Sequence, residues 1–450
     1  MQASRYLGVV VVLGTLTVAC NRSQQAPEPG NTDAGSSMNS IAEQYVRLTL
    51  AVGQHDPDYV DAYYGPPEWK PAGDKLSLDD LLSRARALEG TPELQVGRTA
   101  PVATPAPDEM EALRRRYLQT QLSAMTARLR MLKGERLTFD DESRALYDAT
   151  APVLPESHFQ AVLDRLEPRF PGDGTLVQRY DAWRKAFVIP KEKLDQVFRT
   201  AIEACRERTA RHLQLPPGES FTVEYVTGKS WSGYNWYQGA FQSLIQVNTD
   251  LPVYIDRAVD LACHEGYPGH HVYNVLLEKN LVRDRGWMEF TVYPLFSPQS
   301  LIAEGTANYG IEMAFPGDER SGYEEKVLFP AAGLDPSKAR EYYAVQELVE
   351  QLAYAGNEAA RRYLNGEIDA AQAARWLEKY ALMPNDRAAQ RVRFFDQYRS
   401  YVINYNLGKD MIRDFIERRA GQQPPDRQPA TRWEEFGRLL SSPRLPSALR

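Results

Sequence analysis

Histidine and cysteine are scarce in this chain. Its 450 residues include only six histidines and three cysteines. A basic excess is also missing, because 53 lysines and arginines stand against 60 aspartates and glutamates and give a net charge of -7. This balance gives no reason to expect nucleic acid as a partner. So few cysteines do not make a disulfide framework, and Cys263 is predicted to be a small buried thiol.

The apolar run near the N-terminus is short. From Tyr6 to Ala19 it has about 14 residues, too few to cross a bilayer comfortably. It follows Arg5 and ends in small residues, so residues 1–20 are predicted to be an export signal. Its last residues resemble a bacterial lipoprotein box, which implies cleavage before Cys20, lipid on the Cys20 sulfur and a membrane anchor in the cell envelope, facing the periplasm. An ordinary secretory signal, with export but no anchor, is the alternative.

The rest of the chain is mostly helical in pattern. Residues 21–40 are rich in Ser, Pro, Gly, Asn and Gln and are predicted to be a disordered tether. Residues 108–133 have strong helical spacing, whereas 221–226 and 243–248 alternate as strands do. Residues 41–450 are therefore expected to form a single catalytic domain that is mainly α, with a small β-sheet beside the helix that carries the motif described next.

Three of the six histidines lie within residues 263–271, and Glu265 directly follows the first of them. These residue types are the ones a hydrolytic zinc centre needs. The spacing is close to His-Glu-x-x-His, but Pro268 stands four residues after His264. A proline there removes the donor for the His264 carbonyl and clashes with it, so a straight helix cannot continue. We predict a helix ending near Glu265, a Gly-Tyr-Pro-Gly turn and a second helix from His270; histidines that only cap and pack around a turn are the alternative.

The second metal-binding histidine is either His270 or His271. Adjacent helical residues point about 100° apart, so the two should not both bind one ion. We favour His270, with His271 as the alternative. Asp260, one turn before His264, is placed to orient a ligand imidazole; a surface charge is the alternative.

A third ligand is predicted in the helix that follows Ser297 and Pro298, a good helix start. Glu304 lies about two turns into this helix among small residues. Small neighbours let another helix approach closely, and a carboxylate there is unfavourable unless it is paired or bound to metal. Asn308, one turn further, is placed to hydrogen-bond a ligand histidine.

Residues 231–239, between the two predicted strands, are rich in aromatic residues and contain two glycines. This turn is expected to line a substrate cleft. The predicted substrate contacts are Tyr234, Trp236 and Asn248, and an edge strand there would hold an extended peptide by main-chain pairing. A packed hairpin with half-buried rings is the alternative.

The histidine motif and Glu304-Gly305, with Ala307 and Tyr309, resemble the bacterial proteins grouped as domain of unknown function 885. Residues 401–409 resemble a late Ser-Tyr-x-x-Gly helix of that family, and the resemblance covers roughly residues 41–420. It implies a helical, gluzincin-like zinc peptidase fold, with the metal-site core at about 190–320 and two histidines and a glutamate on the metal. It also implies that Tyr405 hydrogen-bonds the developing oxyanion; a core tyrosine is the alternative.

The expected function follows from these residues. Zn²⁺ held by His264, His270 and Glu304 would acidify a bound water, and Glu265 would act as the general base. We therefore expect hydrolysis of amide bonds in a peptide substrate in the cell envelope. A cell-wall amidase with the same residues and a non-catalytic metal-binding envelope lipoprotein are the alternatives.

Overall fold

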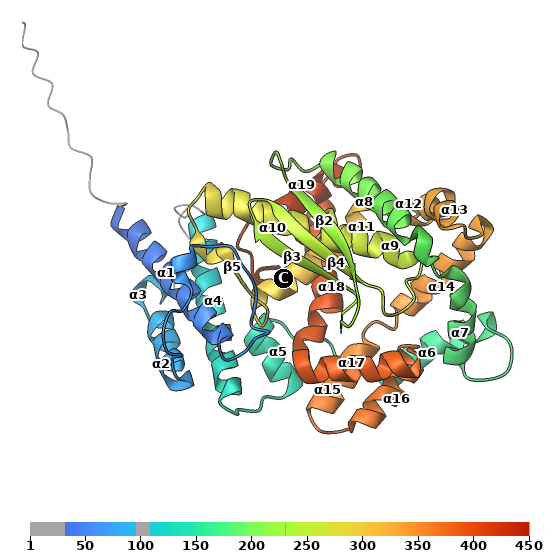
Figure 1. Cartoon of the computed structure of the whole chain (residues 1–450), viewed down its shortest axis with the longest axis horizontal. Coiled ribbons are helices and arrows are strands. Elements are labelled where there is room, and N and C mark those ends of the chain that lie inside the picture. The colour runs from blue at the N-terminus through green and yellow to red at the C-terminus, as the bar shows by residue number, and fades with distance from the viewer. Residues whose placement is uncertain (1–31, 96–108, 230, 450) are drawn as a thin grey trace, which may run out of the picture.

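The computed structural model describes residues 32–95, 109–229 and 231–449 (Figure 1). The chain is 66% helical and its sheets are small, which confirms the predicted mainly α class. The predicted signal peptide, with Cys20, lies outside the described residues. Within the described ranges, none of the helices combines the length and apolar character that a membrane crossing requires.

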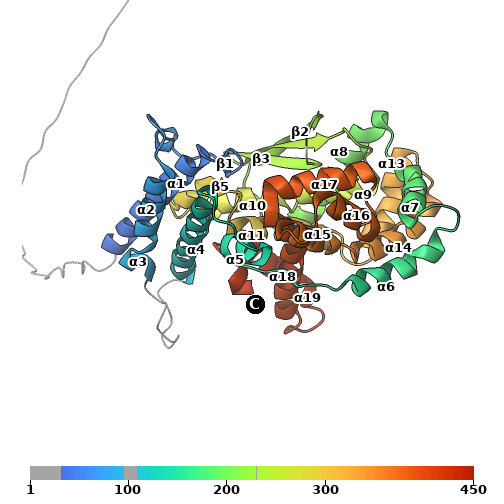
Figure 2. The same cartoon turned by 90° about the horizontal axis from the view of Figure 1, so that it is seen from below.

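The N-terminal helices gather at one end of the molecule (Figures 1 and 2). They are α1 (Thr32–Gly53), α2 (Leu78–Glu89), α3 (Pro92–Gln95) and α4 (Glu109–Leu132). The predicted helix at 108–133 is confirmed by α4. Helix α1 begins inside the predicted tether, so the helical part starts earlier than Ile41.

Two small sheets are present in the described part of the chain. β1 (Val60–Tyr63) pairs antiparallel with β5 (Val292–Pro294). The other sheet has the order β2-β4-β3, with β2 (Ser220–Val226) parallel to β4 (Gln242–Asn248) and β3 (Gly233–Gly239) antiparallel to it. Both predicted strands are confirmed. The intervening stretch was predicted to be a turn, but most of it is strand β3.

The centre of the molecule is built from five helices. These are α9 (Asp256–Leu261), α10 (His270–Leu277), α11 (Pro298–Ala314), α18 (Ile403–Ala420) and α19 (Gln428–Leu440). The three-stranded sheet lies over α9 and α10 (Figures 1 and 2). Helix α11 is buried along nearly its whole length and starts at Pro298 as predicted. The Ser297 hydroxyl donates to the Pro294 carbonyl, at 2.7 Å, and does not cap the helix.

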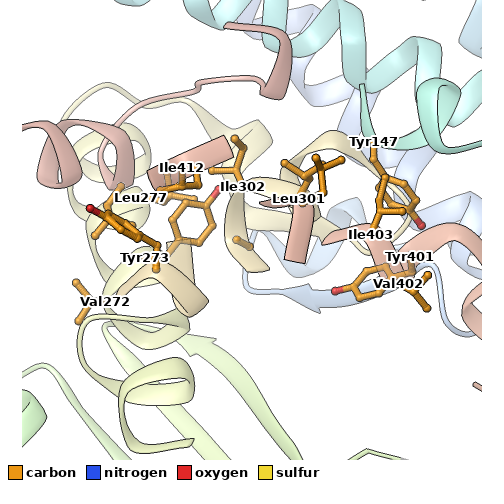
Figure 3. Close-up of a cluster of buried hydrophobic side chains, with 14 of the residues drawn as sticks. Tyr147, Val272, Tyr273, Leu277, Leu301, Ile302, Tyr401, Val402, Ile403 and Ile412 are labelled. Carbon is orange, nitrogen blue, oxygen red and sulfur yellow. The ribbon is translucent and has the colours of Figure 1, made fainter. Parts of the chain in front are cut away.

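Helices α11 and α18 cross at two glycines. A Cβ on Gly305 would lie 2.6 Å from the Gly408 backbone, and one on Gly408 would lie 2.8 Å from the Leu301 carbonyl oxygen. Real Cβ atoms do not approach so closely, so both positions need glycine. Apolar side chains on the same helices, Leu301 and Ile302 of α11 and Ile412 of α18 among them, surround the crossing (Figure 3). The predicted close approach of a second helix at Glu304 is confirmed.

The remaining helices flank this centre. They are α5 (Phe139–Tyr147), α6 (Glu156–Leu166), α7 (Leu176–Arg184), α8 (Leu194–Ala210), α12 (Glu319–Tyr323), α13 (Phe329–Ala332), α14 (Ala339–Glu350), α15 (Ala355–Leu364), α16 (Ala370–Tyr380) and α17 (Asn385–Tyr398). One large apolar cluster contains residues from α1 through α19, and a smaller one lies around Phe159, Tyr180 and Tyr380.

Candidate metal centre

The histidine motif forms the predicted helix break. After α9 the chain makes a π-helical turn (Ala262–Gly266), passes the cis Tyr267–Pro268 peptide and enters α10 at His270. The Gly269 N–H donates to the Cys263 carbonyl at 2.9 Å. A Cβ on Gly269 would lie 1.9 Å from the His264 carbonyl oxygen, so only glycine permits this fold-back. The turn brings the rings of His264 and His270 to 4.6 Å between centroids, at right angles.

Glu304 of α11 faces both imidazoles. Its Oε2 lies 3.3 Å from His264 Nε2 and 3.8 Å from His270 Nε2. Apart from these two contacts, this Oε2 is buried and has no hydrogen-bond partner. Because an unsatisfied buried carboxylate oxygen is costly, a cation shared among the three groups would stabilise its position between two imidazole nitrogens. The donor set therefore fits a zinc ion.

Glu265 lies beside this group. One carboxylate oxygen of Glu265 and one ring nitrogen each of His264 and His270 all lie within 4.8 Å of one another. The Asn235 side chain of β3 donates to the Glu265 backbone carbonyl at 2.7 Å and fixes the turn against the sheet. Glu304 is the better third ligand, since one of its oxygens faces both rings. Glu265 then lies next to the metal site without being one of its three ligands.

Asn308 and Tyr401 fix the orientation of two of the ligands, His264 and Glu304. Asn308 donates from its amide nitrogen to the Tyr405 carbonyl at 3.1 Å, so its Oδ1 accepts from His264 Nδ1 at 3.0 Å. The Nε2 lone pair of His264 is thereby turned toward Glu304. The Tyr401 hydroxyl donates to Glu304 Oε1 at 2.7 Å. The predicted contact of Asn308 with a histidine is confirmed, whereas Tyr401 was not predicted to have a role.

His271, the alternative ligand, lies in a different cluster. It is fully buried, and its Nδ1 and Nε2 lie 2.9 Å from Ser243 Oγ and Glu219 Oε2 respectively. The same Glu219 oxygen accepts from the Tyr267 hydroxyl at 2.7 Å. Both ring nitrogens of His271 are therefore occupied, and it is His270 that faces Glu304.

The electrostatics favour positive charge between the rings. Burial alone would lower the pKa of His264, but the contact with Glu304 and the charges of Glu265 and Glu304 raise it to about 9. Burial and the charge of His264 lower the pKa of His270 to about 4. Burial raises the pKa of Glu265 to about 7 against the opposing effect of His264. Burial also acts to raise the pKa of Glu304, but the two histidines hold it below its usual value. A neutral His270 beside two buried carboxylates is a donor set that suits a divalent cation.

Asp260 does not orient a histidine. Its carboxylate pairs with Arg257 at 3.0 Å and with Arg320 at 2.8 Å. The predicted orienting contact is therefore wrong, because both arginines lie closer to this carboxylate than the His264 ring does in the folded chain.

Cys263 is not a free thiol. It forms a disulfide with Cys205 of α8 across 58 residues, with 5.7 Å between the Cα atoms. The prediction of a small buried thiol is wrong, because folding places α8 against the histidine turn. The residue before His264 is thus covalently tied to a second helix.

A large cleft opens onto the centre. Its volume is about 1610 Å³, and its lining includes His264, Glu265, His270 and Glu304. Tyr405 also lines it, and no hydrogen bond to its hydroxyl is found among the described residues. The predicted oxyanion contact of Tyr405 stays a prediction.

The three predicted substrate residues differ in position. Tyr234 lines the cleft, and its hydroxyl donates to Asp61 at 3.0 Å. Asn248 also lines it, but its amide donates to the Lys229 and Trp231 carbonyls and holds a loop. Trp236 does not line the cleft; it is 47% exposed on the opposite face of β3 from the buried Asn235. The predicted contact of Trp236 is wrong, because this side chain is largely in solvent although it shares a strand face with Tyr234.

Two of the cleft residues that were not predicted bear on its chemistry. Asp61 of β1 lies beside Tyr234, and burial raises the pKa of its carboxyl to about 7. Arg391 of α17 is the other, and it also lines the cleft. Neither is part of a recognisable motif, so nothing local in the sequence marks them.

The comparisons with known proteins find similarity in structure alone. No family model and no curated protein sequence matches the chain. A putative lipoprotein from Colwellia psychrerythraea is similar in structure, with 17% identity and a TM-score of 0.49 over 85% of this chain and 69% of that chain. A putative lipoprotein of unknown function from Shewanella oneidensis has 12% identity and a TM-score of 0.44 over 80% of this chain and 72% of that chain. Similarity this distant carries no argument about activity, and the resemblance to domain of unknown function 885 stays a prediction.

Proposed function

We propose that this protein is a zinc-dependent peptidase. The single observation that carries the proposal is the buried, unpartnered Oε2 of Glu304 between the Nε2 atoms of His264 and His270. A structural metal site has four protein ligands, whereas three ligands that open onto a cleft are typical of a catalytic one. The three ligands and the cleft support the catalytic class.

His264, His270 and Glu304 would hold the zinc, with Asn308 and Tyr401 orienting two of them. A zinc ion bound there would supply a Lewis acid and an acidified water. Glu265 accepts the proton of the attacking water and delivers it to the leaving amine, because its carboxylate lies beside both histidines while Glu304 takes the third ligand position. Its pKa of about 7 suits both halves of that transfer.

Tyr405 would complete the site. Its hydroxyl lines the cleft, and burial together with the charges of Glu304 and Glu265 raises its pKa well above the usual value, so the group stays protonated. A protonated hydroxyl can donate a hydrogen bond to the carbonyl oxygen of the scissile amide as negative charge develops on it.

The proposed location is outside the cytoplasm, anchored by lipid on Cys20. The N-terminal sequence supports this location. The Cys205–Cys263 disulfide supports it independently, because such bonds form and persist in oxidising compartments.

The test combines zinc content with digestion of a peptide library. The protein with bound zinc should cleave peptides, and a chelator should abolish cleavage until zinc is restored. Glu265→Gln should keep its zinc and lose about 10²- to 10⁴-fold in rate, as removal of a general base does. Glu434→Gln, at an exposed glutamate in α19, is the matched control and should keep full activity. Full activity in Glu265→Gln would reject the general-base assignment, and zinc without cleavage of any peptide would favour a binding protein.

A further inference from the structure

One face of α17 forms a wall of the cleft. Arg387, Arg391, Phe394 and Tyr398 all line it. They recur at intervals of three and four residues, which places them on one side of a helix. Helix α17 lies below the three-stranded sheet in Figure 1, and Tyr234 of that sheet lines the same cleft. The cleft therefore separates an arginine-bearing helix from the sheet.

Arg391 has no anionic partner. Its Nε is buried and has no hydrogen-bond partner, and no ion pair to it is found in the part of the chain that the structure describes. The guanidinium instead lies 4.5 Å from the ring of Phe394 and 5.8 Å from that of Tyr405. Burial lowers the pKa of Arg391, which shows that no nearby carboxylate compensates for its desolvation.

Most other arginines of the cleft have carboxylate partners: Arg184 pairs with Asp256, and Arg432 pairs with Glu417. Arg387, one turn before Arg391, donates to the Pro252 carbonyl at 3.4 Å. Arg391 is half-buried, with its Nε fully covered. A desolvated, unpaired guanidinium is unfavourable unless a ligand completes it, and its fork matches a carboxylate with two parallel hydrogen bonds. The open guanidinium of Arg391 is therefore suited to a carboxylate brought in from outside the protein.

Tyr405 lies between Arg391 and the metal centre. Its ring lies 5.8 Å from the Arg391 guanidinium and 5.7 Å from the ring of Tyr401, whose hydroxyl donates to Glu304. The centre itself is acidic, with Asp61 adding a third carboxyl. Arg391 would attract a substrate carboxylate, which fixes the direction in which a peptide lies in the cleft.

We propose that Arg391 binds the C-terminal carboxylate of the peptide, so that the protein is a carboxypeptidase that releases a short C-terminal piece. That piece is short, because Arg391 contacts Tyr405, which lines the cleft at the centre. This inference rests on the proposed peptidase function. It adds the substrate class, namely peptides with a free C-terminus.

The first measurement is hydrolysis of acetyl-Ala-Ala-Ala-Phe and of its C-terminal amide by the zinc-loaded protein. The free acid should be cleaved about 10- to 100-fold faster, as expected for one charge-assisted hydrogen-bonded pair. In Arg391→Gln the acid should slow to the rate of the amide. Arg393→Gln, at an exposed arginine of the same helix, should behave as the unmodified protein does.

The second measurement is binding, which does not depend on turnover. Calorimetry with Glu265→Gln should show the acid binding about 10- to 100-fold more tightly than the amide. The preference should vanish when Arg391→Gln is added. Arg391→Lys keeps the charge and the stem, so it should fold and retain part of the preference, which guards against loss of packing as the explanation.

Equal cleavage and equal binding of acid and amide would overturn the proposal while leaving the peptidase intact. A requirement for a free N-terminus, with no effect of amidation, would also overturn it and would point to an amine bound near Asp61. If the protein holds no zinc and cleaves nothing, the proposed function fails, but the binding comparison still decides whether Arg391 recognises a carboxylate.

Discussion

His270 and His271 are neighbours in α10, and each lies near a glutamate, but the two pairs have different surroundings. In the Glu219 cluster, His271 has partners on both ring nitrogens, and Glu219 also contacts Tyr267 and Arg206. In the Glu304 cluster, one buried carboxylate oxygen has no hydrogen-bond partner. A network with every group satisfied stabilises the fold, whereas convergent unsatisfied atoms indicate a site that a ligand completes.

The strongest test replaces each histidine separately. His270→Ala should abolish stoichiometric zinc, because it removes one of three ligands. His271→Ala should keep zinc but lower the free energy of unfolding by about 2–4 kcal/mol, since it leaves a cavity and unpaired groups around Glu219. Metal analysis and denaturant unfolding of both variants check this. Zinc lost from His271→Ala and kept by His270→Ala would reverse the assignment.

Removing the disulfide tests whether the Glu219 and Glu304 clusters are both held in place by this covalent bond. Replacing Cys205 and Cys263 together by alanine should lower the free energy of unfolding by about 2–4 kcal/mol, as expected for a loop of 58 residues. Zinc should remain, because hydrogen bonds and packing also hold the histidine turn. Denaturant unfolding with zinc analysis measures both quantities; unchanged stability would show that the link contributes nothing.

Removing the groups that orient the metal ligands should weaken zinc binding less than removing a ligand does. Asn308→Ala removes the acceptor at His264 Nδ1, and Tyr401→Phe removes the donor to Glu304 Oε1. Each should weaken zinc binding about 10- to 100-fold with little change in stability. Competition with a chromogenic chelator measures the affinity. If both variants bind zinc as the unmodified protein does, these contacts do not support the metal.

The smallest effect on stability is expected from a change in the Glu219 cluster. Ser243→Ala removes one hydrogen bond to His271 and should lower the free energy of unfolding by about 1 kcal/mol. Zinc affinity should stay the same, which makes this variant the counterpart of Asn308→Ala. A fall in zinc affinity here would mean that the two clusters are coupled.

The sequence allowed prediction of features that depend on local geometry. The break at Pro268 follows from proline chemistry, and the prediction of Glu304 rested on small neighbours that a second helix could reach. The preference for His270 also agrees with the structure. Its basis was incomplete, however, since the spacing alone could not show that Glu219 and Ser243 occupy His271.

Features that depend on distant parts of the chain were missed. The Cys205–Cys263 bond needs α8 to lie against the histidine turn, and Arg391 meets the cleft only because α17 packs across from the sheet. Trp236 shows a different limit. Tyr234 and Trp236 lie on the same strand face and only the first lines the cleft, so alternation could not tell which of the two would meet it.

The contact between Gly305 and Gly408 controls the geometry of the candidate metal centre from outside it. Glu304 and Asn308 are on α11, Tyr405 is on α18 and Tyr401 lies just before it, so the spacing of these helices sets the spacing of the groups around the centre. A methyl group at either glycine would push the helices apart without altering any group of the site. Reactivity could therefore be retuned, or lost, through a pair of residues that carry no chemistry of their own.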